Sequence, residues 1–424
     1  MWRDSQLLSP EYPELDRVMA GKADQALTGH AALSVWEPHI RALVTICPVS
    51  AESYSGPLNG VTVGVKDIID VVGVPTRNGS ATSGDANPAS CDADVVAALR
   101  GAGADILGKT VTTEFAFTDP TDCRNPYDIE RSPGGSSSGS GAAVAAGLVD
   151  IALGTQTAGS LIRPAAYCGV VGFKPTYGVL PTQGVTPLAP SFDSVGVIAR
   201  TVVAAKATFV AINGHVSAQI GAPLRAARWL LPGDMRAEPD AHDALDAAEQ
   251  ALRLCCEMQE APSASVDTTT IVAAHRTVMQ AEAAEAHGHL LSGASAELLR
   301  PKFRAGLEAG ALLEAAQVGA ARLVLRSAAE EFWQSMDGVD VILTLPVPDG
   351  APRLDGSTGF QDWLTPWTVF GGPLISLPWG LDRLGRPRAV MLAGKPGADV
   401  TLLDLAAELE QLAPATPAPE PPSA

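Results

Sequence analysis

Residues 132–175 read SPGGSSSGSGAAVAAGLVDIALGTQTAGSLIRPAAYCGVVGFKP, a stretch with few charges and two serine–glycine clusters, at 134–139 and 157–160. Small residues at this density let one backbone segment approach another, or a ligand, closely. Between the clusters, residues 142–149 predict a helix and residues 151–153 a short buried strand. The clusters are therefore expected to be turns held by buried elements, which favours an active site over a flexible linker.

Three kinds of chemistry could use these turns. A phosphate-binding loop would need Gly-Lys-Ser or Gly-Lys-Thr after its glycines, and neither follows here. Residues 135–139 formally match the nucleophile elbow G-x-S-x-G, with Ser137 as nucleophile, but an elbow needs a buried strand before it and residues 125–131 are polar. The third candidate is a serine activated by a lysine from elsewhere in the chain.

That lysine is Lys66, in the middle of an apolar, strand-like run at residues 60–72. Burial disfavours the charged form of a lysine and lowers its pKa, so a neutral amine in such a place can act as a base. A lysine at a strand end that points to water, or that pairs with Asp67 or Asp70, would have only a structural role. The residues alone leave both interpretations open.

Five short motifs follow one another in a fixed order: Gly64-Val65-Lys66-Asp67, Gly134-Gly135-Ser136-Ser137, Gly154-Thr155-Gln156-Thr157-Ala158-Gly159-Ser160, Pro164-Ala165-Ala166-Tyr167-Cys168-Gly169 and Gly172-Phe173-Lys174-Pro175-Thr176. In order and spacing they resemble the amidase signature family, most densely over residues 57–201. Segments 340–344 and 372–378 resemble it more weakly. The alternation of predicted strands and helices separately indicates an α/β fold. The resemblance implies a single large domain with a central mixed β-sheet flanked by many α-helices.

The resemblance also implies a Ser–cis-Ser–Lys triad, with Ser160 as nucleophile, Ser136 as the cis-serine and Lys66 as base. A serine hydroxyl is a poor nucleophile until a base takes its proton, and Ser136 can accept a hydrogen bond on one side while it donates on the other. Ser160 would form an acyl-enzyme, the relay would protonate the leaving amine, and water would release the acid. The family's oxyanion hole matches four consecutive backbone N–H groups: those of Thr157, Ala158, Gly159 and Ser160.

The chain departs from the commonest family pattern beside the nucleophile. Gln156 stands where many members carry Asp, Ile162 stands where many carry Arg, and Arg163 follows the nucleophile by three positions. This version resembles the motif of bacterial malonamidases, in which an arginine at that position holds the substrate carboxylate. A guanidinium fork suits a carboxylate, so Arg163 is expected to bind one, although pairing with a structural Asp stays open. The resemblance places Thr155 and Ser137 among the substrate-side residues.

The composition limits the possible partners and compartments. The chain has 424 residues, 46% of them hydrophobic, and a formal net charge of −18, which argues against a nucleic-acid partner. No apolar run reaches the ~20 residues that span a bilayer, and the first residues lack the features of a signal peptide. The six cysteines show neither metal spacing nor a disulfide framework. We expect a cytoplasmic protein without membrane contact, metal or cofactor. The family resemblance implies that it forms a homodimer.

One amidase domain is expected over residues 1–412. It would comprise the signature core at 57–201, a variable helical region on the substrate side at 202–335, and a return to the core at 336–412. Residues 413–424 are rich in Pro, Ala and Glu, a composition that predicts a disordered tail.

Periodicity predicts further helices over residues 19–27, 31–42, 91–103, 240–258 and 295–333, the last interrupted at Pro301, Gly306 and Gly310. The variable region holds five of the seven histidines, without ligand spacing. His287 and His289 are two positions apart and would lie on different sides of a helix. A solvated or capping role is expected for these histidines.

The sequence therefore predicts an amidohydrolase that cleaves a linear C–N amide, with a small carboxylate-bearing amide such as malonamate as substrate. Three alternatives stay open. The chain could be the ammonia-producing, amidase-like subunit of an amidotransferase complex. It could cleave esters or carbamates with the same triad, or it could be a scaffold protein that has lost turnover.

Overall fold

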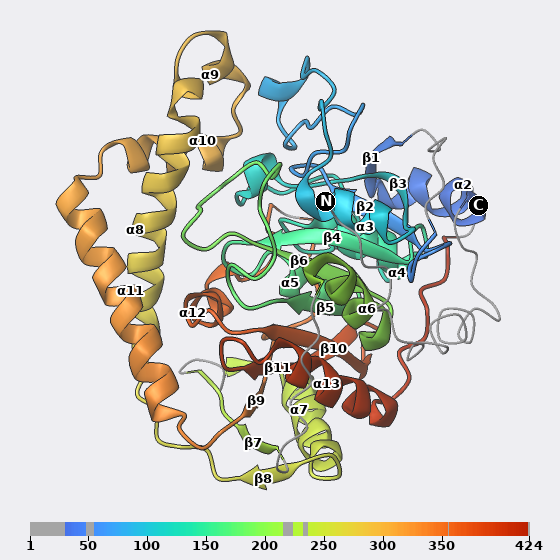
Figure 1. Cartoon of the computed structure of the whole chain (residues 1–424), viewed down its shortest axis with the longest axis vertical. Helices are drawn as coiled ribbons and strands as arrows, with labels where there is room; N and C mark the ends of the chain where they lie inside the picture. The colour runs from blue at the N-terminus through green and yellow to red at the C-terminus, as the bar shows by residue number, and fades with distance from the viewer. Residues whose placement is uncertain (1–29, 48–54, 215–223, 232–235, 355, 423–424) are drawn as a thin grey trace.

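The computed structural model describes residues 30–47, 55–214, 224–231, 236–354 and 356–422 (Figure 1). Its centre is one mixed sheet of eleven strands. In spatial order the strands are β1 (Leu43–Ile46), β3 (Asp105–Thr110), β2 (Thr62–Lys66), β4 (Ile151–Gln156), β6 (Ser194–Ala199), β5 (Val171–Lys174), β10 (Leu374–Leu381), β11 (Pro387–Gly394), β9 (Val341–Thr344), β7 (Arg225–Arg228) and β8 (Glu257–Gln259). The predicted α/β fold with a central mixed sheet is confirmed.

Helices cover both faces of the sheet (Figure 1). One face carries α3 (Asp94–Gly101), α6 (Val202–Asn213), α7 (Pro239–Leu252) and α13 (Asp399–Leu412). The other carries α4 (Ser138–Ala145) and α5 (Ile162–Tyr167). Helix α2 (His30–Ile40) precedes β1 and corresponds to the helix expected at 31–42, whereas the helix expected at 19–27 lies outside the described residues.

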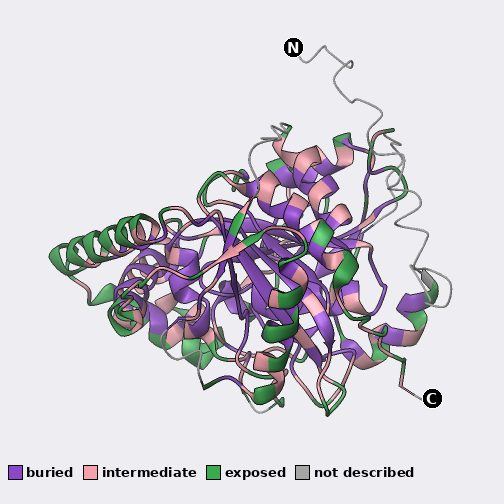
Figure 2. Ribbon diagram, turned by 90° about the horizontal axis from the view of Figure 1, so that it is seen from below, coloured by how far each residue is buried: buried purple, intermediate pink, exposed green. Residues whose placement is uncertain are grey.

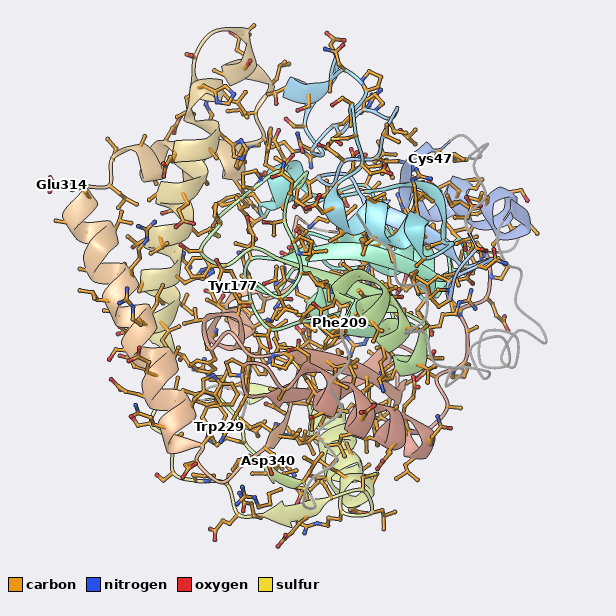
Figure 3. All side chains as sticks on the ribbon, in the orientation of Figure 1. Cys47, Tyr177, Phe209, Trp229, Glu314 and Asp340 are labelled. Carbon is orange, nitrogen blue, oxygen red and sulfur yellow. The ribbon has the colours of Figure 1, made fainter. Side chains whose placement is uncertain are left out.

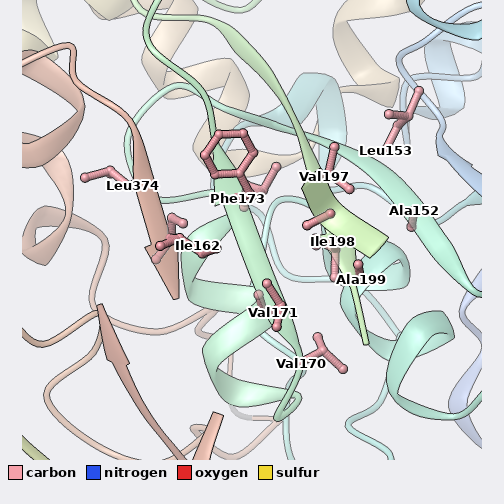
Figure 4. Packing of buried hydrophobic residues seen from close by; sticks show 14 of the residues in the cluster. Ala152, Leu153, Ile162, Val170, Val171, Phe173, Val197, Ile198, Ala199 and Leu374 are labelled. Atoms are coloured by element: carbon pink, nitrogen blue, oxygen red, sulfur yellow. The ribbon is translucent and has the colours of Figure 1, made fainter. Parts of the chain in front are cut away.

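The central strands are buried on both faces, as expected for a sheet covered by helices on each side. Every residue of β4 and β6 is buried. Figure 4 shows how Leu153, Val197 and Phe173 pack from neighbouring strands into this core. The buried sheet therefore holds the residues at the ends of its strands in fixed positions.

Three strand ends converge at one edge of the sheet. β2 pairs in parallel with both β3 and β4, so the carboxyl ends of these strands lie together. Lys66 is the last residue of β2, and Thr155 is near the end of β4. β6 runs antiparallel to β4 and pairs Ser194 with Gln156 there, which brings the start of β6 to the same edge. Ligands of parallel sheets bind outside the carboxyl ends of the strands.

A group of helices packs together beside this edge of the sheet (Figure 1). It contains α8 (Thr268–His287), α9 (Ala294–Leu298), α10 (Pro301–Ala311) and α11 (Ala315–Ser335), and α8 also contacts α12 (Thr365–Val369). Helix α11 is the outermost and is largely exposed in Figure 2, with Leu325 and Phe332 as its buried residues.

The segment expected as one interrupted helix at 295–333 forms three separate helices. Pro301 begins α10, as predicted, but Gly306 and Gly310 lie inside α10 and do not break it. An added Cβ would lie 2.7 Å from the Phe117 ring at Gly306 and would clash with the Gln280 carbonyl oxygen at Gly310. These glycines are therefore explained by close packing of α10 on its neighbours rather than by helix termination.

The expected disordered tail also differs from the structure. Residues 413–422 have no regular secondary structure, but two hydrogen bonds hold them to the domain. The Thr416 hydroxyl accepts from the Gly380 N–H (3.1 Å), and the Pro417 carbonyl accepts from the Tyr127 hydroxyl (2.9 Å). The Tyr127 side chain is half-buried and its hydroxyl takes a polar partner, and composition alone does not show that the tail supplies one.

The described residues hold neither a helix suited to a membrane nor a metal-binding cluster. None of their helices has the length and apolar character needed to cross a membrane. Within the same residues, no group of three His, Cys, Asp or Glu side chains could hold a metal ion.

Candidate active site

Lys66 is fully buried at the end of β2. Its Nζ donates to Ser136 Oγ and to Thr155 Oγ1, both at 2.7 Å. Burial lowers the pKa of Lys66 to about 7, and the nearby Asp193 carboxylate partly opposes this shift. The amine is therefore partly neutral near neutral pH and able to accept a proton.

The two carboxylates that could have made Lys66 purely structural are engaged elsewhere. Asp67 forms an ion pair with Lys109 at 2.9 Å, with both side chains buried. Asp70 accepts from the Thr76 hydroxyl at 2.6 Å. The alternative left open by the sequence, an exposed or ion-paired Lys66, does not match this arrangement.

The first serine cluster leads directly into α4, which begins at Ser138, four residues earlier than the sequence predicts. The Gly135–Ser136 peptide bond is cis. Ser137 is fully buried, and its hydroxyl donates to the Thr155 carbonyl (3.3 Å) while it accepts from the Thr155 N–H (3.2 Å). The family resemblance implies a place for Ser137 on the substrate side, but its hydroxyl instead hydrogen-bonds this loop to the backbone of β4.

The second cluster lies in the loop of residues 157–161, which joins β4 to α5 and carries Ser160. The Ser160 carbonyl accepts from the Ser137 N–H at 3.1 Å, so the two serine clusters are joined. Within the described residues, the N–H groups of Ala158, Gly159 and Ser160 donate to no acceptor. An added Cβ at Gly159 would lie 2.9 Å from the Leu364 Cβ, so the loop fits closely beneath its neighbours.

Gln156 organises the start of α5. Its Oε1 accepts from the N–H groups of Leu161 (3.2 Å) and Ile162 (3.1 Å), which the helix itself cannot satisfy. Its Nε2 donates to Thr368 Oγ1 at 2.9 Å. The sequence marked Gln156 only as a departure from the family pattern, and these contacts give it a definite task.

Arg163 is buried in the first turn of α5. Its Nη2 donates to the Gly135 carbonyl (2.6 Å), its Nη1 donates to the Phe360 carbonyl (3.4 Å), and its Nε has no partner in the described structure. Burial lowers the pKa of its guanidinium. No described carboxylate lies within ion-pair distance, so pairing with a structural Asp is not seen among these residues.

Asp193 is a site residue that the sequence did not indicate. Its carboxylate accepts from the Thr157 hydroxyl (2.5 Å) and from the N–H groups of Leu188 (2.8 Å) and Ala189 (2.9 Å). Burial raises its pKa. Asp193 precedes β6 within Ser191-Phe192-Asp193-Ser194, and nothing local in that tetrapeptide distinguishes it from a surface turn.

A cavity of about 190 Å³ borders this side of the site. Its walls combine apolar side chains, hydroxyls and one carboxylate. The lining residues are Ile68, Ala116, Thr155, Thr157, Thr182, Val185, Thr186, Pro187, Leu188, Pro190, Asp193, Ser194 and Val195. Tyr177, labelled in Figure 3, donates its hydroxyl to the Pro190 carbonyl at 2.6 Å and steadies this wall.

Helix α8 of the variable region reaches the site through polar side chains. The Nε2 of His275 lies 2.8 Å from the Thr157 carbonyl oxygen, and that of His287 lies 2.7 Å from the Pro187 carbonyl oxygen. Glu282 accepts from the Ser191 N–H at 2.9 Å. The expectation of solvated or capping histidines is wrong for His275 and His287. Both are buried and hold loop carbonyls, which helix periodicity alone cannot reveal.

The comparisons with known proteins agree with this architecture. A family model described as Amidase matches residues 45–403. A glutamyl-tRNA(Gln) amidotransferase subunit from a Synechococcus species is 30% identical over 456 residues, covering 92% of this chain and 93% of the relative. The corresponding subunit from Methanosarcina barkeri is 46% identical over 168 residues, which are 38% of this chain and 35% of the relative.

A solved structure gives the same picture. Peptide amidase from Stenotrophomonas maltophilia superposes with a TM-score of 0.80 at 25% identity, covering 96% of this chain and 97% of that one. The finer resemblance to malonamidases stays a prediction. Since the family model spans most of the chain and a full-length relative reaches 30% identity, this chain belongs to the amidase signature family.

Proposed function

We propose that the chain hydrolyses the C–N bond of a small linear amide, with Ser160 as nucleophile, Ser136 as proton relay and Lys66 as base. The observation that carries this proposal is the 2.7 Å hydrogen bond between Lys66 Nζ and Ser136 Oγ. Both partners are buried, and among the described residues no carboxylate hydrogen-bonds the amine. A lysine whose pKa is about 7 is available as a base near neutral pH.

Each proton has a defined course in this mechanism. In the neutral amine, one N–H donates to Thr155 Oγ1 while the lone pair accepts the Ser136 proton. Ser136 accepts the proton of Ser160 as Ser160 Oγ bonds to the substrate carbonyl carbon, and the N–H groups of residues 157–160 stabilise the oxyanion. The C–N bond breaks as the proton returns from Lys66 through Ser136 to the leaving nitrogen. Water then cleaves the acyl-enzyme through the same relay.

For the substrate, we propose an amide that carries a free carboxylate, such as malonamate. The support is the state of Arg163, whose buried guanidinium contacts two backbone carbonyls and, among the described residues, no carboxylate. Buried charges are normally paired, because desolvation of an unpaired charge is costly. A substrate carboxylate would supply the missing anion one helical turn from Ser160, in place of the long contact to Phe360.

Covalent labelling with an alkyl fluorophosphonate tests the nucleophile without knowledge of the substrate. Attack by Ser160 Oγ forms an O–P bond and expels fluoride, and the hydroxyl proton is lost, so labelled protein gains the mass of the probe less that of HF at one serine. We expect wild type to be labelled, Ser160→Ala to remain unlabelled, and Ser137→Ala to be labelled at Ser160. Labelling that persists at another residue in Ser160→Ala would exclude the assigned nucleophile.

Ammonia release from paired amides with and without a carboxylate tests the substrate class, with matching esters as a third arm. We expect Arg163→Met to lose turnover of the acidic amides, mainly through a higher KM, and to retain turnover of neutral ones. Faster turnover of neutral amides by wild type, together with no effect of Arg163→Met, would reject the carboxylate substrate and keep the amidase. Exclusive cleavage of the esters would reject the amidase itself.

A second candidate function is supported by the Synechococcus relative, which is named as an amidotransferase subunit and is matched over 93% of its length. In that case the same triad would release ammonia for a partner chain. Purification from the native cell and sizing distinguish the two functions. A stable heteromeric complex, with ammonia release only in its presence, would favour the amidotransferase role, whereas turnover by the chain alone favours the hydrolase. The homodimer stays a prediction for the same sizing measurement.

A further inference from the structure

Two carbonyl groups of loop 157–161 are held from outside by side chains of distant helices. The Thr157 carbonyl faces the Nε2 of His275 on α8 at 2.8 Å. The Ala158 carbonyl accepts from the hydroxyl of Thr368 on α12. The next residues are held differently, because Gln156 Oε1 accepts from the N–H groups of Leu161 and Ile162. The two supported peptide units are therefore Thr157–Ala158 and Ala158–Gly159.

These carbonyls belong to the peptide units that carry the N–H groups of Ala158 and Gly159. A trans peptide unit is planar, and its C=O and N–H point in opposite directions. A donor that fixes the carbonyl on one side therefore fixes the N–H on the other. It also polarises the unit, so that the N–H becomes a better donor.

We propose that His275 and Thr368 are positioning residues that orient the N–H groups of Ala158 and Gly159 toward the oxyanion. This proposal rests on the proposed function, in which those N–H groups receive the substrate oxygen. Neither residue touches the substrate, and each acts through one backbone peptide unit.

The hydrogen-bond chemistry assigns the direction of both contacts. A carbonyl oxygen only accepts, so the Nε2 of His275 must carry a proton. Burial lowers the pKa of His275 to about 4, which leaves a neutral ring whose single proton is fixed on Nε2. The ring packs against that of Phe192, with centroids 4.2 Å apart and the planes tilted by 36°, and is thereby held in place.

Thr368 is fixed by its second partner. Its hydroxyl accepts from Gln156 Nε2 at 2.9 Å, which leaves its own proton for the Ala158 carbonyl. Gln156 thus orders both ends of the loop, directly at Leu161 and Ile162 and through Thr368 at Ala158. All three supporting side chains are buried, so water does not compete for these bonds.

Matched substitutions separate this role from packing. Thr368→Val removes the hydroxyl at nearly constant volume, and Thr368→Ser keeps it. His275→Phe removes the donor but keeps a ring against Phe192, and His275→Gln keeps an N–H donor. The readouts are the second-order rate of Ser160 labelling by the alkyl fluorophosphonate, kcat and KM for ammonia release, and the melting temperature.

We expect Thr368→Val and His275→Phe to label about tenfold more slowly, a smaller loss than the roughly 100- to 1,000-fold cost of removing an oxyanion donor outright. The loss should be in kcat, with KM nearly unchanged, and Thr368→Ser and His275→Gln should recover most of the rate. The double variant Thr368→Val/His275→Phe should lose more than either single variant, because each supports a different N–H.

Three results would overturn the proposal. Wild-type labelling rates in folded Thr368→Val and His275→Phe would show that the N–H groups need no outside support. Equal losses in the conservative and disruptive variants, tracking the melting temperature, would assign both residues to packing. Labelling that persists in Ser160→Ala would remove the proposed function and this proposal together, whereas the first two results leave the proposed function intact.

Discussion

Lys66 and Lys109 lie at the ends of neighbouring parallel strands and are equally buried, but they have different partners. In the register of β2 and β3, Val65 is opposite Lys109, so the two lysine side chains point to opposite faces of the sheet. Lys109 meets the Asp67 carboxylate at 2.9 Å, whereas Lys66 donates, within the described part of the chain, to the hydroxyls of Ser136 and Thr155 and to no carboxylate. Burial alone therefore does not single out the proposed base, and the partners of each amine distinguish the two lysines.

The largest expected effect is on the Lys66 side of this comparison. Lys66→Met removes the proposed base and should slow Ser160 labelling by about 100- to 10,000-fold, the usual contribution of general acid–base catalysis. The melting temperature should change little, because a desolvated amine is replaced by an apolar chain of similar length. Labelling within a few-fold of wild type would mean that another group accepts the serine proton.

Lys109→Met should show the opposite pattern. It leaves the buried Asp67 without a counter-ion, so the free energy of unfolding should fall by about 3–5 kcal/mol. Urea denaturation measures this loss. The fraction that remains folded should label Ser160 at close to the wild-type rate. A folded but unreactive Lys109→Met would show that the two lysines are functionally linked.

The pH dependence of Ser160 labelling tests the protonation state of Lys66 directly. Protonated Lys66 cannot accept a proton, so the labelling rate should rise with pH through about 7, the pKa of Lys66, and level off above it. The negative charge of Asp193 raises that pKa. Asp193→Asn removes the charge, so the rising limb should move to lower pH. A limb that stays in place, or moves to higher pH, would contradict this electrostatic link.

The smallest expected effect concerns a third buried lysine. Lys174 donates to the Pro175 carbonyl at 2.7 Å, and burial lowers its pKa to about 8. Lys174→Met loses one hydrogen bond and removes a desolvated amine, so its unfolding free energy should change by no more than about 1 kcal/mol. A loss as large as that of Lys109→Met would show that burial, rather than the paired carboxylate, sets the cost.

The sequence was informative wherever a motif is local. Lys66, Ser136 and Ser160 each stand in a short run with distinctive neighbours, and the structure brings Lys66 and Ser136 into direct contact. The alternating pattern also predicted the α/β class, which the sheet confirms. These features depend on contiguous residues, so pattern and spacing are enough to find them.

The supports of the site could not be found in this way. His275 and Thr368 lie more than 100 and 200 positions from the carbonyls they hold, and each looks like an ordinary helix residue. The family resemblance places Ser137 on the substrate side, although its hydroxyl hydrogen-bonds to the backbone of Thr155. Such roles follow from tertiary contacts, which a single sequence does not encode at any fixed spacing.

The late position of Thr368 has a consequence for biosynthesis. The ribosome completes Lys66, Ser136 and Ser160 early, but about 200 further residues, or roughly 10–40 s of elongation, precede Thr368. Strand β10, which enters the sheet beside β5, emerges only after that. A nascent chain therefore contains every proposed catalytic side chain before Thr368 is available to hydrogen-bond loop 157–161. We expect the proposed reaction to begin only after the last strands have joined the sheet.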